Sequence, residues 1–112
     1  MLFRSVYVEP REVNGRPLDQ KIASIGVAIK RHVAFHGVGL NICTDLRHFD
    51  LILPCGLQDT QMTSLQREYG LRGLGDAPGM AEAKRAVQGA FVHTFDTYDW
   101  TLPQLAALGA PA

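Results

Sequence analysis

"KIASIGVAIK" (residues 21–30) and "HVAFHGVGLNICTDL" (residues 32–46) are the two stretches that decide the fold. Both are rich in valine, isoleucine and phenylalanine, which is typical of β-strands. Glycines interrupt them at positions 26, 37 and 39. A glycine within a strand allows another backbone or a ligand to come close. We therefore predict two strands that pair with each other and leave room beside their glycines.

The neighbouring segments predict another strand, a turn region and a short helix. Residues 6–8, "VYV", are β-branched and aromatic and predict a strand. Residues 9–20, "EPREVNGRPLDQ", hold two prolines and an Asn-Gly pair, so we expect a loop or a long hairpin connection. Residues 62–71, "MTSLQREYGL", predict a short strand that passes into a helical turn at residues 65–69.

The clearest helix is predicted from about Pro78 to Tyr98. Asp76 is the expected N-cap, and Pro78 suits the first helical turn. Apolar residues recur at helical spacing along this segment, so we expect one face of it to be core. The residues of that face are Met80, Ala83, Val87, Ala90, Phe91 and Phe95.

Strands followed by one amphipathic helix indicate an α/β (α+β) domain, with a mixed sheet covered by the helix on one face. A length of 112 residues suits a single domain over residues 1–112. Residues 101–112 are mostly small and are expected to form a loose tail.

The charge balance excludes several classes of partner. Lysine plus arginine number 11, and aspartate plus glutamate also number 11. We therefore expect neither a nucleic-acid surface nor a membrane surface. No secretory leader is visible, so we expect a cytoplasmic protein with two free thiols. No metal site is expected, because His32 and His36 in a strand would lie about 13 Å apart.

Cys55 is the first candidate for chemistry. It lies in "LILPCGL" (residues 51–57), between a proline and a glycine that make the chain turn. A nucleophilic thiolate needs access, a lowered pKa and nearby donors for an oxyanion, and backbone N–H groups beside Gly56 are suitable donors. The alternative, a packed free cysteine, is the more frequent role for this residue type.

Lys21 and Cys43 are weighed against their ordinary structural roles. A cation near a thiol stabilises the thiolate, but a lysine at a strand edge is normally solvated. Sequence alone does not place Lys21 beside Cys55. Cys43 lies in "NICTD", where alternation predicts a strand, so we expect it to be packed or half-buried.

Four motifs in order carry a resemblance to a known family. They are "KIASIG" (residues 21–26), "FHGVGLNICTDL" (residues 35–46), "FDLILPCGL" (residues 49–57) and "MTSL" (residues 62–65). This set resembles the carboxy-terminal half of the lipoyl(octanoyl) transferases, and the match runs over about residues 6–98. These enzymes move octanoyl from acyl carrier protein to a lysine of a lipoyl domain. The resemblance implies the fold of the biotin and lipoate ligases.

The resemblance also implies roles for single residues. Cys55 would be the nucleophile that carries octanoyl as a thioester, and Lys21 would lower the pKa of its thiol and assist proton transfer. Neither a metal nor another cofactor would be needed. Two short segments would line the acyl and carbonyl site, namely Ser24, Ile25, Gly26, Gly37, Val38 and Gly39.

The partners follow from the same resemblance. They would be octanoyl-acyl carrier protein and the lipoyl domains of 2-oxoacid dehydrogenases or glycine cleavage proteins. The reaction would take place in the cytoplasm, or in the mitochondrion of a eukaryote.

Three departures from the family pattern are present. Gly39 stands where alanine is usual, residues 9–20 are longer than the usual connection, and the amino-terminal R-G-G and T-x-H-G-P-G-Q motifs are absent. The chain is therefore expected to be a fragment, to pair with a second polypeptide that supplies the other half, or to be inactive. Exposed edges and apolar surface would favour self-association.

Two alternative functions stay open. One is an ATP-using lipoate or biotin ligase, which would not need the cysteine of "PCG". The other is a non-catalytic relict or a module that binds carrier domains.

Overall fold

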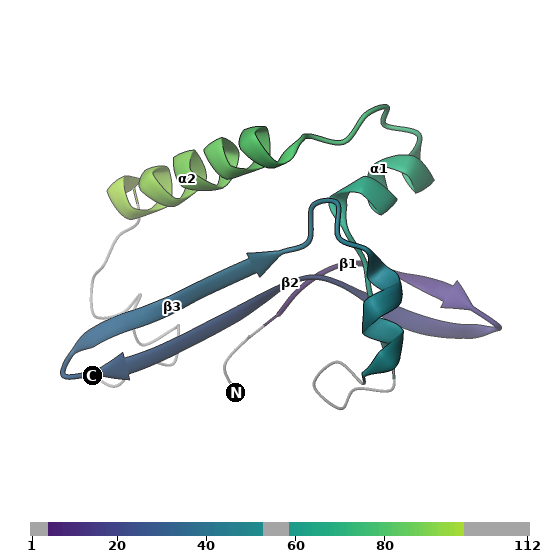
Figure 1. The fold of residues 1–112 in the computed structure, drawn as a ribbon, viewed down its shortest axis with the longest axis horizontal. Helices are drawn as coiled ribbons and strands as arrows, with labels where there is room; N and C mark the ends of the chain where they lie inside the picture. Colours follow the sequence, from purple (N-terminus) through teal and green to yellow (C-terminus); the bar gives the residue numbers. More distant parts are fainter. Residues whose placement is uncertain (1–4, 53–58, 98–112) are drawn as a thin grey trace. The chain divides into compact units, whose positions relative to one another are not determined.

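The computed structural model describes residues 5–52 and 59–97. The chain divides into two units, Met1–Met80 and Ala81–Ala112, which are described separately. The elements, drawn in Figure 1, are strands β1 (Ser5–Val13), β2 (Arg16–Lys30), β3 (Val33–Leu40) and β4 (Thr60–Met62), the 3-10 helix η1 (Leu46–Leu51), and helices α1 (Leu65–Arg72) and α2 (Met80–Thr97).

The first unit is built on a mixed four-stranded sheet, as predicted. β2 is flanked by antiparallel β1 on one edge. On its other edge it pairs with antiparallel β3 through residues 23–30 and with parallel β4 through residues 19–21. Residues 21–30 and 33–40 of the two decisive stretches are therefore confirmed as strand, and residues 23–30 pair with residues 33–40. Residues 41–46 of the second stretch form a loop and the start of η1.

The predicted loop at residues 9–20 is mostly strand. β1 runs to Val13 and β2 starts at Arg16, so only Asn14 and Gly15 form the turn. Their φ values of 53° and 78° are both positive, which is the type I′ pattern that Asn-Gly favours in two-residue hairpins. Pro10 is tolerated because it lies where the register between β1 and β2 shifts, a place that needs no ladder donor.

A second irregularity of the β1–β2 ladder lies at Ile22. Val6 pairs with Ala23 and Tyr7 pairs with Lys21, so Ile22 has no partner on β1 and forms a β-bulge. The carbonyls of Lys21 and Ile22 accept from the N–H groups of Thr63 and Asn41, at 2.8 and 3.0 Å. Successive carbonyls of a regular strand point to opposite edges. The bulge therefore lets both β3 and β4 share one edge of β2.

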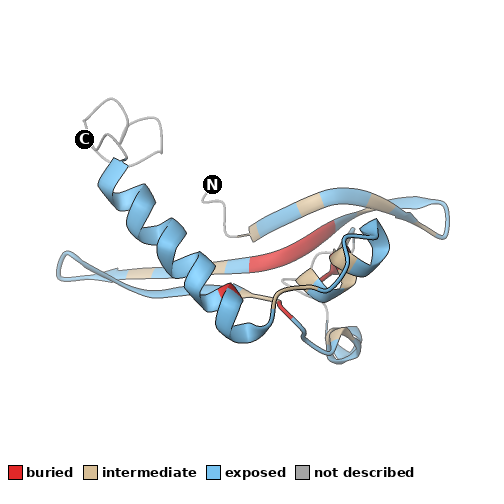
Figure 2. Ribbon diagram, turned by 90° about the horizontal axis from the view of Figure 1, so that it is seen from above, coloured by how far each residue is buried: buried red, intermediate tan, exposed pale blue. Residues whose placement is uncertain are grey.

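The core of this unit is small and centres on β2. Residues 20–23 are all buried, and Figure 2 shows this stretch in the middle of the long strand. Ile42 and Met62 add to it from the loop after β3 and from β4. Beyond Ser24, β2 pairs with β3 alone among the described strands. We call residues 25–38 the β2–β3 arm. Most of its apolar side chains are exposed, among them Ile29 at 75 % and Val27 at 61 %.

Two short helices follow β3 and β4 along the chain. η1 has six residues and is capped by Asp45, whose side chain accepts from the N–H of Arg47. α1 has eight residues where one turn was predicted. Ser64 caps its N-terminus, and Gly73, with φ of 63°, closes its C-terminus.

The second unit contains α2, which confirms the predicted helix. It begins at Met80, so Asp76 lies too far ahead to be its N-cap. The expectation that its apolar face is core is wrong for most of that face. Ala83 is buried, but Val87, Phe91 and Phe95 are exposed, and the rings of the two phenylalanines lie 4.7 Å apart. Neither described helix has the length and apolar character to cross a membrane.

Candidate functional site

Lys21 lies at the centre of the first unit. In the sheet it stands between Tyr7 of β1 and Met62 of β4. The residue is only 3 % exposed, so the expectation that it is a solvated edge lysine is wrong. Lysine is almost never fully buried without a specific reason. Its burial makes it the first residue to consider as part of a site.

The bulge at Ile22 decides which face of the sheet Lys21 occupies. Side chains alternate along a strand, so Lys21 of a regular strand would share a face with Ala23 and Ile25. The unpaired Ile22 shifts the register by one residue, and a shift of one residue moves a side chain to the other face. Lys21 is thereby placed on the face of β2 that carries Ser24 and Gly26.

The two segments predicted to line the acyl site lie directly opposite each other. Ser24 pairs with Gly39, Ile25 with Val38, and Gly26 with Gly37. The six residues therefore form three consecutive rungs of the β2–β3 ladder, although 11 positions separate the nearest pair in the sequence.

Among the residues that the structure describes, one face of these rungs is almost free of side chains. Ser24, Gly26, Gly37 and Gly39 share that face, because paired residues project to the same side and alternate along each strand. A Cβ added at any of the three glycines would meet no atom of residues 5–52 or 59–97 within 4 Å. The glycines therefore do not serve close packing against a neighbouring strand, which was one of the two expectations. They leave open space beside the backbone.

This bare face extends toward the hairpin end of the arm. Ala28 continues it on β2, and Phe35 stands opposite Ala28 on β3. From Ser24 to Ala28 the strip is about 13 Å long at the usual strand rise. Lys21 lies on the same face at one end of the strip. At the other end Phe35 pairs with Ala28, and its ring lies 4.6 Å from the ring of His36.

Cys55 belongs to residues 53–58, which lie outside the described residues. The ends of that connection are described. The N–H of Ile52 donates to the carbonyl of Phe49 (3.3 Å), and the carbonyl of Asp59 accepts from the N–H of Asp19 (2.9 Å). Asp19 is two residues from Lys21, and Cys55 is four residues from Asp59.

A buried polar network on the other side of β2 was missed by sequence reasoning. Glu68 of α1 is 4 % exposed and accepts from the Thr63 hydroxyl at 2.5 Å. Arg11 of β1 donates to both carboxylate oxygens of Glu68, at 2.8 and 3.0 Å, and to Gln20 Oε1 at 3.1 Å. Arg72 donates to the same carboxylate at 3.3 Å.

This network joins β1, β2 and α1 with Thr63, the residue that follows β4. Burial raises the pKa of Glu68, but the hydrogen bonds from Thr63, Arg11 and Arg72 and the charge of Arg11 outweigh burial and lower it below its usual value. The carboxylate is therefore ionised and paired at neutral pH. The signal in the sequence was weak, since only a glutamate four residues after the N-cap Ser64 pointed to it.

Asn41 is a second residue that the sequence analysis did not single out. Its N–H donates to the carbonyl of Ile22, and its side-chain amide donates to the carbonyl of Thr63 at 3.0 Å. Its own carbonyl accepts from the N–H of Leu65 at 3.0 Å. Asn41 thus holds together β2 at the bulge, the end of β4 and the start of α1.

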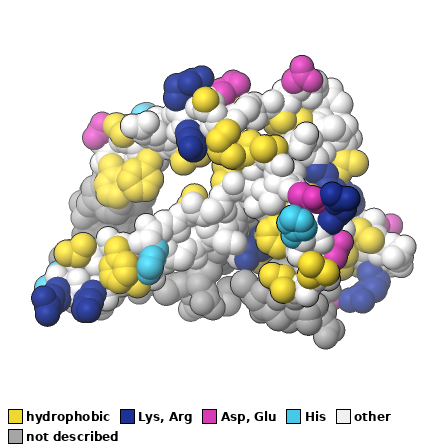
Figure 3. Space-filling model, viewed as in Figure 1, with side chains coloured by type: hydrophobic (Ala, Val, Ile, Leu, Met, Phe, Trp, Pro, Cys, Tyr) yellow, Lys and Arg dark blue, Asp and Glu magenta, His cyan; other side chains and the backbone are white. Residues whose placement is uncertain are grey.

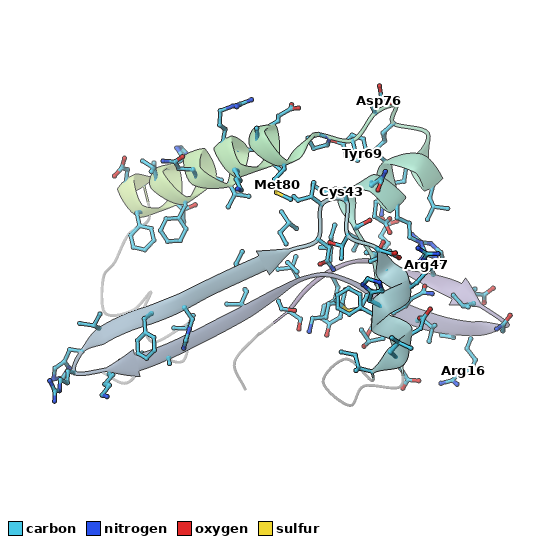
Figure 4. The ribbon with its side chains drawn as sticks, in the orientation of Figure 1. Arg16, Cys43, Arg47, Tyr69, Asp76 and Met80 are labelled. Atoms are coloured by element: carbon cyan, nitrogen blue, oxygen red, sulfur yellow. The ribbon has the colours of Figure 1, made fainter. Side chains whose placement is uncertain are left out.

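Cys43 does not occupy the packed strand position that was predicted. It follows β3 in a loop and is exposed with a free thiol (Figure 4). Of the two histidines that were considered as metal ligands, His32 lies in the β2–β3 turn and His36 lies in β3. Within residues 5–52 and 59–97, no group of three or more His, Cys, Asp or Glu side chains is arranged to hold a metal ion.

Comparison with known proteins gives a consistent result. The model of the family described as "Lipoyl protein ligase A/B catalytic domain" matches residues 5–92. An octanoyltransferase of Deinococcus radiodurans is 65 % identical over 105 residues, which cover 94 % of this chain and 31 % of that protein. An octanoyltransferase of Myxococcus xanthus is 45 % identical over 83 residues, covering 74 % of this chain and 22 % of that protein.

A third relative agrees with these two. An octanoyltransferase of Hyphomonas neptunium is 41 % identical over 93 residues, which cover 80 % of this chain and 37 % of that protein. The chain thus spans between about a fifth and two fifths of the length of the relatives it matches.

Proposed function

The chain belongs to the lipoyl protein ligase A/B catalytic domain family, and we propose that it supplies the acyl-carrying part of an octanoyltransferase. In this role it moves an octanoyl group from acyl carrier protein to a lysine of a lipoyl domain, a step of lipoate biosynthesis. The names of the relatives support octanoyl transfer, and the residues of the first unit support a site for it.

The observation that carries the proposal is the placement of Lys21 and the glycines on one face. The bulge at Ile22 brings Lys21 to the face that holds Ser24, Gly26, Gly37 and Gly39. Open space beside three glycines suits an extended alkyl chain, since no side chain of the described part of the chain occupies it. A buried cation at the end of the strip suits the thioester carbonyl and a thiolate.

The proposed chemistry has two steps. The Cys55 thiolate attacks the carbonyl carbon of the octanoyl thioester, the new C–S bond forms, and the donor leaves as a thiolate that takes up a proton. The amine of the acceptor lysine then attacks the Cys55 thioester, a C–N bond forms, and the Cys55 sulfur leaves while the amine loses a proton. Lys21 stabilises the thiolate in both steps and moves the proton.

Lipoyl domains of 2-oxoacid dehydrogenases or glycine cleavage proteins are the proposed acceptors, and the cytoplasm is the proposed compartment. The alternative of an ATP-using ligase leaves Cys55 of the Pro-Cys-Gly sequence without a role. Because the matched relatives are longer, the remaining acceptor surface belongs to parts that this chain does not include or to a second polypeptide.

Intact-mass measurement tests the first step. The purified 112-residue chain is mixed with octanoyl-acyl carrier protein, and the mass is expected to rise by one octanoyl group. The Cys55→Ser variant should lose the adduct, whereas Cys43→Ser should keep it, which makes the exposed Cys43 a control within the same chain.

The Lys21→Met variant tests whether Lys21 activates the Cys55 thiol or whether the thiol reacts without its help. This variant keeps the length and apolar stem of the side chain and removes the charge, so it should slow loading of Cys55 about a hundredfold at pH 7. Raising the pH should recover part of the loss, because more thiolate then forms without the cation. A folded wild-type chain that gains no adduct would contradict the proposed function.

A further inference from the structure

The β2–β3 turn has an unusual backbone for its residues. Arg31 and His32 form a two-residue turn between the paired residues Lys30 and Val33. Their φ values are 51° and 64°, both in the left-handed region that β-carbons disfavour. Histidine is found there more often than most residues, whereas arginine has no such preference.

The same chain contains a matched comparison. The β1–β2 turn has the same length and the same sign of φ at both positions, and it uses Asn14 and Gly15, the residue pair that this geometry prefers. The β2–β3 turn therefore keeps Arg31 and His32 at a cost in backbone free energy. Strained backbone of this kind is often found where the side chains have a function.

The side chains at this turn form an exposed basic cluster. Lys30, Arg31 and His32 are all exposed, and Figure 3 shows Lys, Arg and His side chains at the end of the β2–β3 arm. Residues 20–44 contain no aspartate or glutamate. Within the described part of the chain, neither Lys30 nor Arg31 makes an ion pair. By contrast, Arg16 at the other hairpin pairs with Asp59.

We propose that Lys30, Arg31 and His32 form a docking point for an acidic face of the protein domain that delivers the acyl group. This inference rests on the proposed function. Lys30 is nine residues from Lys21, which is about 30 Å at the usual strand rise. A carrier domain of about 100 residues is also about 30 Å across, so it can contact the tip while its acyl arm lies along the glycine face.

The neutral net charge of the chain favours a protein partner over nucleic acid. A nucleic-acid-binding surface needs many cations along a face, whereas this cluster is small and confined to one hairpin tip. A few unpaired charges at the edge of an interface chiefly raise the association rate and steer a protein partner of opposite charge.

Binding of labelled octanoyl-acyl carrier protein tests the proposal. The probe is titrated with the wild-type chain and with Lys30→Thr/Arg31→Asn/His32→Gly, which gives the turn its preferred residues. At low ionic strength the variant should bind about tenfold more weakly, and the difference should vanish at high salt. Its midpoint in urea should equal or exceed that of the wild type, which excludes loss of fold as the cause.

Lys84→Gln/Arg85→Gln is the matched control, since it removes two exposed cations from α2. This control should bind the probe as the wild type does. Arg31→Lys keeps the charge and should also retain binding. Equal losses in the tip and α2 variants, unchanged binding in the tip variant, or tighter binding of a single-stranded oligonucleotide than of the carrier would each overturn the proposal.

A small thioester keeps this proposal separate from the proposed function. Octanoyl-N-acetylcysteamine has no protein part, so it should load Cys55 equally in the wild type and in the tip variant. Failure of the wild type to load would contradict the proposed function, while the carrier titration would still decide the docking point. Slower loading of the tip variant by the small thioester would overturn the docking proposal, because the tip would then act in the chemistry.

Discussion

Replacing Glu68 by glutamine should destabilise the first unit strongly, although the substitution keeps the shape of the side chain. Glu68 accepts from Thr63, Arg11 and Arg72 and is almost completely buried. Glutamine retains one oxygen as an acceptor but brings an NH2 group toward the Arg11 donors. Arg11 would then lose its bidentate partner and keep only Gln20.

The size of the expected loss in stability follows from the contacts of Glu68. Breaking a buried ion pair by removing one partner costs about 3–5 kcal/mol. The Arg11 side chain is 27 % exposed and can regain some water, and the glutamine oxygen still accepts one hydrogen bond. We therefore expect a loss of about 2–3 kcal/mol in the free energy of unfolding. With a urea m-value of about 1–1.5 kcal/mol/M, the midpoint should fall by about 2 M.

The pH dependence gives an independent check. The pKa of Glu68 is lowered in the folded state, so its contribution to stability is fully present above its unfolded pKa, near 4.5. It is lost as the pH falls through the folded pKa. The difference in unfolding free energy between the wild type and Glu68→Gln should thus stay constant from pH 7 to about 5 and become smaller at lower pH.

Urea unfolding followed by far-UV circular dichroism at several pH values measures both effects. Glu12→Gln is the matched control, because Glu12 is an exposed acidic residue next to Arg11 in β1. This substitution should change the free energy of unfolding by less than about 0.5 kcal/mol. A Glu68→Gln variant as stable as the Glu12 control, or a gap that persists unchanged to pH 3, would refute this account of the network.

Three further changes test other parts of the unit. Asn41→Asp removes the donor to the Thr63 carbonyl and should lower the free energy of unfolding by about 2 kcal/mol at pH 7. Part of this loss should be recovered in acid, where the new carboxyl is protonated and can donate. A loss of stability that is independent of pH would contradict this. Ser64→Ala removes the cap that accepts from the Arg67 N–H at 3.2 Å and should lower the unfolding free energy by about 1 kcal/mol, measured in urea. Gly37→Val meets open space, so stability should hold while octanoyl loading of Cys55 falls about tenfold by intact mass; unchanged loading would show that the glycine face does not hold the acyl chain.

Local patterns predicted the elements well where the cause is local. The Val/Ile/Phe-rich stretches became β2 and β3, and the helical spacing after Pro78 became α2. Residues 9–20 were misjudged because Pro10 and Pro17 read as breakers. Pro10 sits at the register shift, and Pro17 lies just after the turn, so neither interrupts the ladder.

Burial was predicted less well, since it depends on what packs against an element. The apolar stripe of α2 has the pattern of a core face, yet Phe91 is 64 % exposed. Conversely, Lys21 has the character of a surface residue and is buried, and Cys43 has the character of a core residue and is exposed. A pattern shows which surface is apolar, but only the neighbouring elements decide whether it is covered.

The sequence by itself determined the strand pair, the long helix and, through its ordered motifs, the family. Only the tertiary structure decided that Lys21 shares a face with Ser24, Gly26, Gly37 and Gly39. The reason is a single unpaired residue, Ile22: whether a strand carries a bulge depends on the register of its partners, here β1, β3 and β4, which lie up to 40 residues away along the chain. The local sequence pattern of residues 21–30 does not predict the register of β2 with these strands.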